Sequence, residues 1–306
     1  SVSSFVVTTV EGNKVLLAVS PSFSGILSFD LQTKKTVILD GNNEFLAKSI
    51  LFADTKGMIW AVKTIGNSDS LLQIFDESTG KFIKAKDKNG LIDSDVDNSS
   101  VIKIKADSVG KIWLMVYKLT GEESKYHLYS YDPITATAKE YSFDRAIDGT
   151  FDIGPNDLVY LLSSNTQTVI ALNSQKGISS TYKVLTPVPP SQLYYDSRNR
   201  LWVGNIGWFD FSNQSAFVHW YEIIPSPDFI TYITSAGIWV SASPIYTTET
   251  QDGRLWYYAI NGTGWVDPQI GKWCYFSNIP SVVYQGPSGD LWTVMDNFVY
   301  ELAGIE

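Results

Sequence analysis

A polar turn that leads directly into a tryptophan recurs along this chain of 306 residues. The copies read DTKGMIW, DSVGKIW, DSRNRLW, TSAGIW and GPSGDLW, and two further stretches, VEGNKVL and GPNDLVY, keep the turn without the tryptophan. Their spacing of about 40 to 50 residues predicts a repeat protein. The residues aligned after each turn are Leu16, Trp60, Trp113, Tyr160 (or, equally well, Val159), Trp202, Trp239 and Trp292.

Short apolar runs surround every turn and predict four strands per repeat. Strand A precedes the turn, strand B carries the tryptophan, and strands C and D are separated by a second turn such as DESTGK. Apolar runs bounded by Gly, Asp, Asn and Ser are typical of strands, and helical periodicity is absent. We therefore predict one all-β domain, 1–306, a seven-bladed β-propeller of four-stranded antiparallel blades. The blades cover approximately 4–40, 49–86, 100–143, 148–186, 191–223, 228–277 and 281–303.

The position of the tryptophan follows from this architecture. The A–B turn is polar because it meets water, and Gly57, Gly110, Gly289 and Asn199 can supply its positive φ. Strand B lies in the middle of a blade and is covered on both faces, so its apolar run is nearly continuous. A large flat ring can fill the wedge between neighbouring blades and bury about 150–250 Å². We therefore interpret these tryptophans as core residues.

The run D-x-x-G-x-[IL]-W, followed by an apolar strand that ends in Phe-Asp or Tyr-Asp, resembles the repeats of two-component regulator propellers. NGLIDSDVDNSSVIKIKADSVGKIW (89–113) carries the resemblance best, and similar stretches extend over nearly the whole chain. Propellers of this family form sensor domains outside the cytoplasm in bacterial hybrid histidine-kinase systems. The resemblance therefore implies a sensor-type propeller with an extracytoplasmic location, whether periplasmic, at the cell surface or secreted.

Composition restricts the possible partners. The chain is 44% hydrophobic and 14% aromatic, which is typical of a folded domain. Its net charge of −9 argues against nucleic acid as a partner, because a phosphate backbone requires a basic surface. No apolar run approaches 18 residues, so we expect no membrane insertion. Cys274 is the one cysteine, which excludes an intrachain disulfide and a cysteine metal cage.

Histidine and arginine are scarce in this chain. Streptogramin-lyase-like propellers have similar repeats and use histidine as a base, but His127 and His219 fall on predicted strands C and D at the blade rim. We expect both to be partly exposed strand residues. Sialidase-like propellers clamp a carboxylate with three arginines, whereas Arg198 and Arg200, two of only four here, share one outer turn. We predict no catalytic residue and no cofactor.

One acidic run has the spacing of a calcium loop. Asp93, Asp95 and Asp97 alternate as ligands do in an EF-hand, but Asn98 and Ile104 stand where that loop requires Gly and Glu. We therefore expect a solvated connection between two blades and no metal site, with these three aspartates as the one weak candidate.

Long loops offer candidate ligand-binding residues. We expect B–C loops around 62–70, 115–126 and 241–253 to form one face of the propeller, and a long C–D loop, NGTGWVDPQIGK, to lie on the other. Aromatic side chains beside acidic and amide groups suit carbohydrate or peptide binding. The candidates are Tyr117, Glu122, Tyr246, Glu249 and Trp265.

These features predict a non-enzymatic propeller that binds a small molecule, a carbohydrate, a peptide or a protein partner. Two alternatives stay open: a propeller lyase or hydrolase, and an assembly subunit that pairs through an incomplete blade. The last predicted strand, FVYELA (298–303), has no evident strand D after it. We expect a three-stranded last blade, with completion by N-terminal residues or by a strand from a second chain as the other possibilities.

Overall fold

The computed structural model is all-β in its described residues, apart from short 3-10 turns such as η2 (Pro155–Asp157). The described strands form seven antiparallel sheets, six with four strands and one with three, as the sequence predicts for the fold class. No described helix is long and apolar enough to span a membrane. The structure describes all residues except 1–3, 11–12, 21–22, 41–44, 47–48, 65–69, 93–98, 121–122, 185–191, 204–206, 212–215, 220–244, 260–261, 268–269, 271, 277–282, 286–290, 296–297 and 303–306.

The chain divides into two compact units, Ser1–Thr150 and Phe151–Glu306. The first unit holds three sheets, each in sequential strand order. Sheet one contains β1 (Ser4–Val10), β2 (Asn13–Ser20), β3 (Phe23–Asp30) and β4 (Thr36–Leu39). Sheet two contains β5 (Ser49–Ala53), β6 (Ile59–Lys63), β7 (Leu72–Asp76) and β8 (Lys81–Lys84). Sheet three contains β9 (Ser99–Ala106), β10 (Ile112–Thr120), β11 (Glu123–Asp132) and β12 (Thr137–Tyr141).

The second unit holds the other four sheets, again in sequential order. Sheet four contains β13 (Phe151–Ile153), β14 (Val159–Ser163), β15 (Thr168–Asn173) and β16 (Gly177–Lys183). Sheet five contains β17 (Leu193–Tyr195), β18 (Arg200–Val203), β19 (Gly207–Asp210) and β20 (Ala216–His219). Sheet six contains β21 (Ile245–Glu249), β22 (Leu255–Ala259), β23 (Gly262–Asp267) and β24 (Lys272–Phe276). Sheet seven contains β25 (Val283–Gln285), β26 (Leu291–Met295) and β27 (Phe298–Glu301).

Sheet seven has three described strands, as expected for the last blade. Residues 1–3 and 303–306 lie outside the described part of the chain. The number of blades in a closed ring and the treatment of 1–306 as one domain therefore stay predictions.

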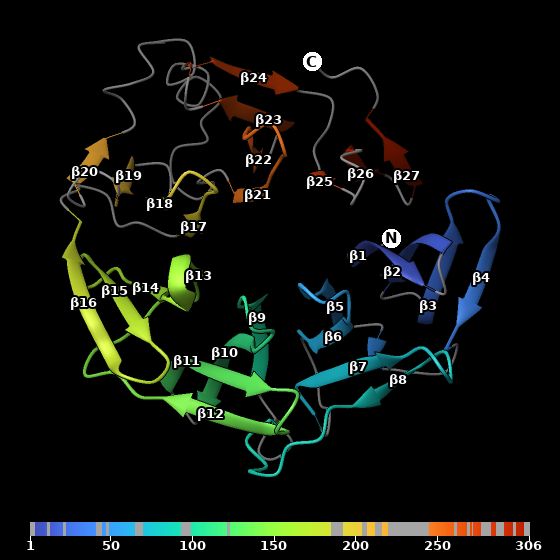
Figure 1. Ribbon diagram of the computed structural model, residues 1–306, viewed down its shortest axis with the longest axis horizontal. Coiled ribbons are helices and arrows are strands. Elements are labelled where there is room, and N and C mark those ends of the chain that lie inside the picture. Colours follow the sequence, from blue (N-terminus) through green and yellow to red (C-terminus); the bar gives the residue numbers. More distant parts are fainter. Residues whose placement is uncertain are drawn as a thin grey trace. The chain divides into compact units, whose positions relative to one another are not determined.

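Neighbouring sheets within each unit pack face to face, and the core lies between them. In the first unit the opening strands β1, β5 and β9 lie on the inner side of their sheets, and β4, β8 and β12 lie on the outer side (Figure 1). One apolar cluster joins sheets two and three through Trp60, Val101 and Tyr129. The Trp60 ring meets the Tyr131 ring edge-on, with centroids 6.1 Å apart. This contact confirms the predicted role of tryptophan between adjacent sheets.

The second strands of sheets two to five are covered on both faces. Every residue of β6 and of β14 is buried, and Trp113 and Trp202 are fully buried on β10 and β18. The nearly continuous apolar runs of the sequence therefore reflect two-sided packing, as predicted. By contrast, β8 on the outer side of sheet two has one buried residue, Phe82, among three exposed ones.

A buried aspartate fixes the A–B turn in sheets two, three and five. The Oδ1 of Asp107 accepts the backbone N–H groups of Val109 (3.2 Å) and Lys111 (2.8 Å), and its Oδ2 accepts the indole N–H of Trp113 (3.0 Å). Asp54 makes the same three contacts in sheet two, and Asp196 makes them in sheet five. A buried carboxylate is costly unless its oxygens are paired. The tryptophan follows the turn because its N–H completes that pairing.

A second aspartate turn joins the third and fourth strands. The Oδ1 of Asp76 accepts the backbone N–H of Ser78 (3.0 Å) and its hydroxyl (2.7 Å), while Oδ2 accepts the Thr79 hydroxyl (2.9 Å). Asp30, Asp132 and Asn173 accept turn N–H groups at the matching positions of sheets one, three and four. These side chains mimic a backbone acceptor and so stabilise tight turns.

The structure corrects the predicted strand order of sheet six. We expected its second strand around Trp239, but Leu255–Ala259 is the second strand, β22, and residues 220–244 lie outside the described part. The turn before Trp256 has the geometry of the other A–B turns, with Gly253 at φ +80° and an N–H from Gly253 to the Thr250 carbonyl (2.7 Å). In the other A–B turns that contain glycine, the glycine stands three residues before the tryptophan, and this spacing was the correct signal for the second strand. In the Trp239 stretch the glycine stands only two residues before the tryptophan.

The C–D turn of sheet two predicts an acid-sensitive contribution to stability. Hydrogen bonds from Ser78 and Thr79 lower the pKa of Asp76 below its usual value of 3.8. A depressed folded-state pKa means that the ionised group stabilises the fold above the unfolded pKa, and that this contribution disappears as the pH falls through the folded pKa. Because Asn173 serves the same turn in sheet four, Asp76→Asn should fold and lose less thermal stability on acidification than the wild type.

Thermal melts from about pH 6 to about pH 2 would measure this difference. Glu77→Gln is the matched control, since it removes the same charge one residue away without touching the turn acceptor. Equal acid sensitivity of Asp76→Asn and wild type would contradict the assignment.

Candidate functional site

A groove of about 530 Å³ opens on the second unit where first strands end and A–B turns begin. Three segments line it: the end of β13 with the following turn, the end of β17 with its turn, and the last residue of β21. The lining residues are Ile153, Gly154, Pro155, Tyr195, Asp196, Ser197, Asn199 and Glu249. The groove therefore combines an apolar wall from sheet four with a polar wall from sheets five and six.

Asp196 shapes the polar wall. Besides the two turn N–H groups and the Trp202 indole, Asp196 accepts a hydrogen bond from the Arg200 Nε at Oδ2 (2.7 Å), and the Arg200 Nη2 forms an ion pair with the same oxygen (2.7 Å). Asp196 is 3% exposed, and its oxygens are largely committed to these donors. Its structural role is to hold the turn that presents Ser197 and Asn199.

Glu249 joins the first strand of sheet six to the turn of sheet five. Its carboxylate accepts the backbone N–H of Ser197 (2.7 Å) at Oε2 and the Ser197 hydroxyl (2.5 Å) at Oε1. The Tyr194 hydroxyl donates to Oε2 at 3.5 Å. Burial, followed by the neighbouring carboxylates of Glu249, Asp152 and Asp196, raises the pKa of Tyr194. Tyr194 is therefore a neutral donor across the physiological pH range.

Stacked tyrosines form the floor between sheets four and five. The rings of Tyr160 and Tyr195 lie 5.5 Å apart with an interplanar angle of 18°. Burial raises the pKa of Tyr160 to about 12 and also raises that of Tyr195. The Tyr195 hydroxyl donates to the Asn199 Oδ1. A Cβ on Gly154 would lie 2.7 Å from one ring and 2.8 Å from the other, so this stack requires glycine.

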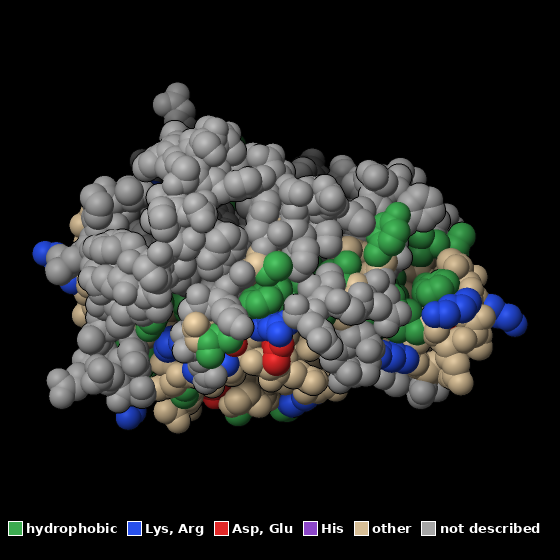
Figure 2. Space-filling model, turned by 90° about the horizontal axis from the view of Figure 1, so that it is seen from above, with side chains coloured by type: hydrophobic (Ala, Val, Ile, Leu, Met, Phe, Trp, Pro, Cys, Tyr) green, Lys and Arg blue, Asp and Glu red, His purple; other side chains and the backbone are tan. Residues whose placement is uncertain are grey.

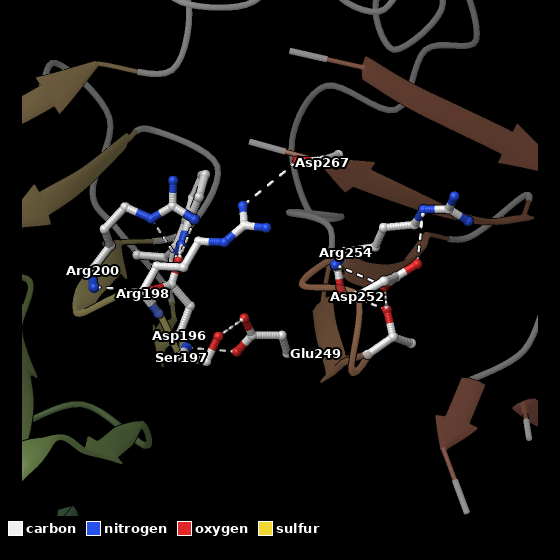
Figure 3. A network of polar contacts seen from close by, with 10 residues as sticks. Asp196, Ser197, Arg198, Arg200, Glu249, Asp252, Arg254 and Asp267 are labelled. Carbon is white, nitrogen blue, oxygen red and sulfur yellow. Dashed lines mark hydrogen bonds and ion pairs between the residues drawn. The ribbon is translucent and has the colours of Figure 1, made fainter. Parts of the chain in front are cut away.

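Three of the four arginines lie in the turns beside the groove, each next to an aspartate (Figure 3). Arg198 faces Asp267 (Nη1–Oδ1 3.6 Å), Arg200 binds Asp196, and Arg254 binds Asp252 (Nε–Oδ2 3.1 Å). The pairs hold these cations in place, and the Arg254 guanidinium also lies 4.3 Å from the Trp265 ring centroid. As predicted, Arg198 and Arg200 share one turn; their pairing with aspartates favours a structural role.

Of the five candidate ligand-binding residues, Glu249 lines the groove. We expected Glu249 in a B–C loop, but it is the last residue of strand β21, just before an A–B turn. Tyr246 lies on the same strand, and its side chain is outside the described part. Trp265 was expected in an exposed loop, but it lies on β23 and is 7% exposed. Both errors follow from the shifted strand order of sheet six.

The remaining candidates belong to the first unit. Tyr117 pairs with Tyr126 across the β10–β11 hairpin, with ring centroids 5.4 Å apart. Glu122 and the acidic run of Asp93, Asp95 and Asp97 lie outside the described residues. Among the residues that are described, no group of three or more His, Cys, Asp or Glu side chains could hold a metal ion.

The two histidines lie on the expected strands. His127 is on β11, where its Nδ1 lies 2.7 Å from the Glu140 Oε1 and its side chain is 28% exposed. His219 ends β20, and its side chain is outside the described part. The partly exposed strand position predicted for His127 is therefore confirmed.

Sequence reasoning missed Gly154, Tyr195, Ser197 and Asn199. Tyr195 ends a first strand, and the other three belong to A–B turns, whose residues were interpreted as solvent-facing. One signal was available: Asn199 stands where Gly57 and Gly110 stand in sheets two and three, and it adopts φ +65°. An asparagine at this position keeps the turn and adds an amide group to its surface.

No protein-family model matches this chain, and no curated protein sequence matches it. Several solved structures are similar to this chain. A streptogramin B lyase structure aligns with a TM-score of 0.65 at 13% identity over 96% of this chain and 91% of that one. A catalytically inactive virginiamycin B lyase from Staphylococcus aureus, with quinupristin, aligns with a TM-score of 0.56 at 17% identity over 82% of each chain.

The extracellular domain of a B. thetaiotaomicron protein described as a hybrid two component system, BT3049, aligns with a TM-score of 0.60 at 13% identity. The alignment covers 98% of this chain but 39% of that one. At these identities the likenesses show the fold alone, which is of the β-propeller class. They include sensor-type domains, as the repeats led us to expect, and enzymes.

The tyrosine stack gives a direct test of the groove wall. Gly154→Ala should destabilise the protein by about 1–3 kcal/mol, because the added methyl group overpacks two aromatic rings. Urea denaturation measures the loss, and near-UV circular dichroism should report a changed tyrosine environment. Gly80→Ala is a useful control, because a Cβ there meets no atom within 4 Å and its cost is limited to the positive φ. A smaller loss for Gly154→Ala than for Gly80→Ala would contradict the described packing.

Proposed function

We propose that this protein is a non-catalytic recognition module whose groove binds a neutral, hydroxyl-rich small ligand of the saccharide class. The observation that carries the proposal is the position of Glu249, whose half-buried carboxylate reaches the groove while Ser197 holds both of its oxygens. A carboxylate offers about four lone-pair sites. Glu249 can therefore accept further hydrogen bonds from ligand hydroxyls in a fixed orientation.

The other lining groups support the same ligand class. Ser197 and Asn199 add a hydroxyl and an amide beside Glu249, whereas Ile153, Pro155 and the Tyr195 ring provide apolar surface. Small-molecule sites typically combine such apolar walls with a few placed polar groups. The C–H groups of a sugar ring can pack against the apolar surface, and its hydroxyls can form hydrogen bonds with the polar groups.

Charge argues against an anionic ligand. Two carboxylates, Asp196 and Glu249, line the groove, and none of the described lining residues is Lys or Arg. Carboxylates repel an anionic ligand and gain little from a neutral one except through hydrogen bonds. The saccharide class fits these constraints better than an acidic peptide.

We further propose that the protein acts outside the cytoplasm in a sensor-type role. The resemblance of its repeats to two-component regulator propellers supports this, as does its structural likeness to an extracellular domain. Ligand recognition without chemistry is the function such a domain requires.

Binding experiments with neutral mono- and oligosaccharides, by saturation-transfer NMR and calorimetry, test the proposal. Glu249→Gln and Ser197→Ala should each weaken binding about tenfold or more, since hydrogen bonds to charged groups contribute about 1.5–3 kcal/mol. Glu140→Gln is the matched control, because Glu140 lies on β12 in the other unit. Failure of every neutral saccharide to bind at millimolar concentration would refute the proposal. If the wild-type protein converts a bound sugar to a product and Glu249→Gln does not, the protein is an enzyme and the recognition proposal is wrong.

A further inference from the structure

Two neighbouring residues join the A–B turn of sheet five to sheet six. Ser197 donates its backbone N–H and its hydroxyl to the Glu249 carboxylate at the end of β21. Arg198, the next residue, extends over the A–B turn of sheet six, where a Cβ on Gly253 would lie 2.9 Å from the Arg198 Cζ and closer still to its Nη2. This turn therefore contacts sheet six at two places, namely the strand end that lines the groove and the turn that follows it.

Charge also holds the Arg198 guanidinium in place. Its side chain is 20% exposed, and its Nη1 lies 3.6 Å from the Asp267 Oδ1 at the end of β23 (Figure 3). This Nη1 is buried and has no hydrogen-bond partner among the described residues. The space-filling view likewise shows basic side chains directly beside acidic ones (Figure 2). A largely buried ion pair adds little net stability, because desolvation offsets the attraction. We therefore look for its role in geometry.

Sheets two and three show the cation contact alone. Counted from the buried aspartate, Arg198 is the third residue of its turn, and Lys56 is the third residue of the A–B turn of sheet two. A Cβ on Gly110, in the turn of sheet three, would lie 2.7 Å from the Lys56 Cε and 2.8 Å from its Nζ. The first strand of sheet three ends in Ala106, whose methyl group cannot accept an N–H from the turn of sheet two. A cation over the next glycine therefore does not require the carboxylate contact.

Sheets six and seven show the other contact alone. Gln285 ends β25, and its Oε1 accepts the N–H of Gln251 (3.0 Å), the second residue of the A–B turn of sheet six. The third residue of that turn is Asp252, which is not a cation. Among the described turns, the two contacts occur together between sheets five and six, and this is where the groove lies.

We propose that Arg198 is the positioning residue of the groove: it holds its turn on sheet six and thereby keeps Ser197 against Glu249. Arg198 does not line the groove, so it acts through its neighbour and not by contact with a ligand. Groups that are already ordered bind more tightly, because less conformational entropy is lost on binding. The inference rests on the proposed saccharide site, but it also makes a claim about the unliganded protein.

Hydrogen exchange of the Ser197 amide, followed by NMR in the unliganded protein, tests this claim. Arg198→Met removes the charge and keeps an unbranched side chain. It should accelerate the exchange about tenfold, because the contact between the N–H and the carboxylate opens more often. Arg198→Lys should stay within about twofold of the wild type, since the contact is not bidentate and Lys56 makes it in sheet two.

The Gln251 amide is the internal control, because its acceptor lies on sheet seven and its exchange should not change in Arg198→Met. An unchanged exchange rate of Ser197 in Arg198→Met would overturn the proposal. Equal acceleration of Ser197 and Gln251 would also overturn it, because that result would show a general loss of stability.

A second variant displaces the guanidinium without removing it. The added methyl group of Gly253→Ala pushes Arg198 off the turn and should accelerate the Ser197 exchange as Arg198→Met does. Gly57→Ala is the matched control: Gly57 has φ +81° against +80° for Gly253, and a Cβ there meets no atom within 4 Å. It should leave the Ser197 exchange at the wild-type rate. If Gly253→Ala does not fold, the Arg198 variants still decide.

Calorimetry with a neutral saccharide that binds the wild type tests the link to recognition. Arg198→Met should weaken this binding about fivefold, because the lining groups must then be ordered by the ligand, and Arg198→Lys should retain it. The two proposals fail separately: if no saccharide binds, the proposed function is wrong and the exchange rates still test Arg198. A faster Ser197 exchange with unchanged saccharide affinity would overturn the role of Arg198 in binding.

Discussion

The buried aspartate of the A–B turn is the contact on which the sheets depend. In three sheets its carboxylate accepts two turn N–H groups and one indole N–H, and the three aspartates, Asp54, Asp107 and Asp196, are 3–7% exposed. An unpaired carboxylate could not be buried there, because its desolvation would cost several kcal/mol. In these three sheets the aspartate and the tryptophan therefore complement each other, and together they fix where the second strand begins.

The turns that lack this aspartate show what the constraint permits. The Gly154 N–H binds the Leu158 carbonyl and the Thr250 N–H binds the Arg254 carbonyl, both at 2.9 Å, as the Asp54 N–H binds the Met58 carbonyl. The backbone turn therefore persists with glycine or threonine in the first position. In sheet four, Tyr160 has no indole N–H to satisfy, and glycine leaves room for the ring of Tyr195. The groove lies where this altered turn adjoins the regular turn of sheet five.

The sequence predicted local structure better than it predicted the site. Alternating turns and apolar runs correctly placed the strands around Trp60, Trp113 and Trp202, because each depends on residues close in the chain. Sheet six was placed wrongly because the tryptophan of the Trp239 stretch was given more weight than the position of its glycine. The groove could not be predicted from the sequence, because Glu249 and Ser197 are in contact although 52 positions separate them, and no local pattern encodes that contact. Glu249 was named as a candidate, but for a loop that is in fact a strand end.

A double-mutant cycle between Asp107 and Trp113 tests the central claim most directly. This pair is preferable to Asp196 and Trp202, because Asp196 also binds Arg200. Unfolding free energies of Asp107→Asn, Trp113→Phe and the double variant isolate the contact from the volume lost with the indole. A hydrogen bond to a buried charge predicts a coupling of about 1.5–3 kcal/mol. Additive effects, with a coupling below about 0.5 kcal/mol, would show that aspartate and tryptophan stabilise the turn independently.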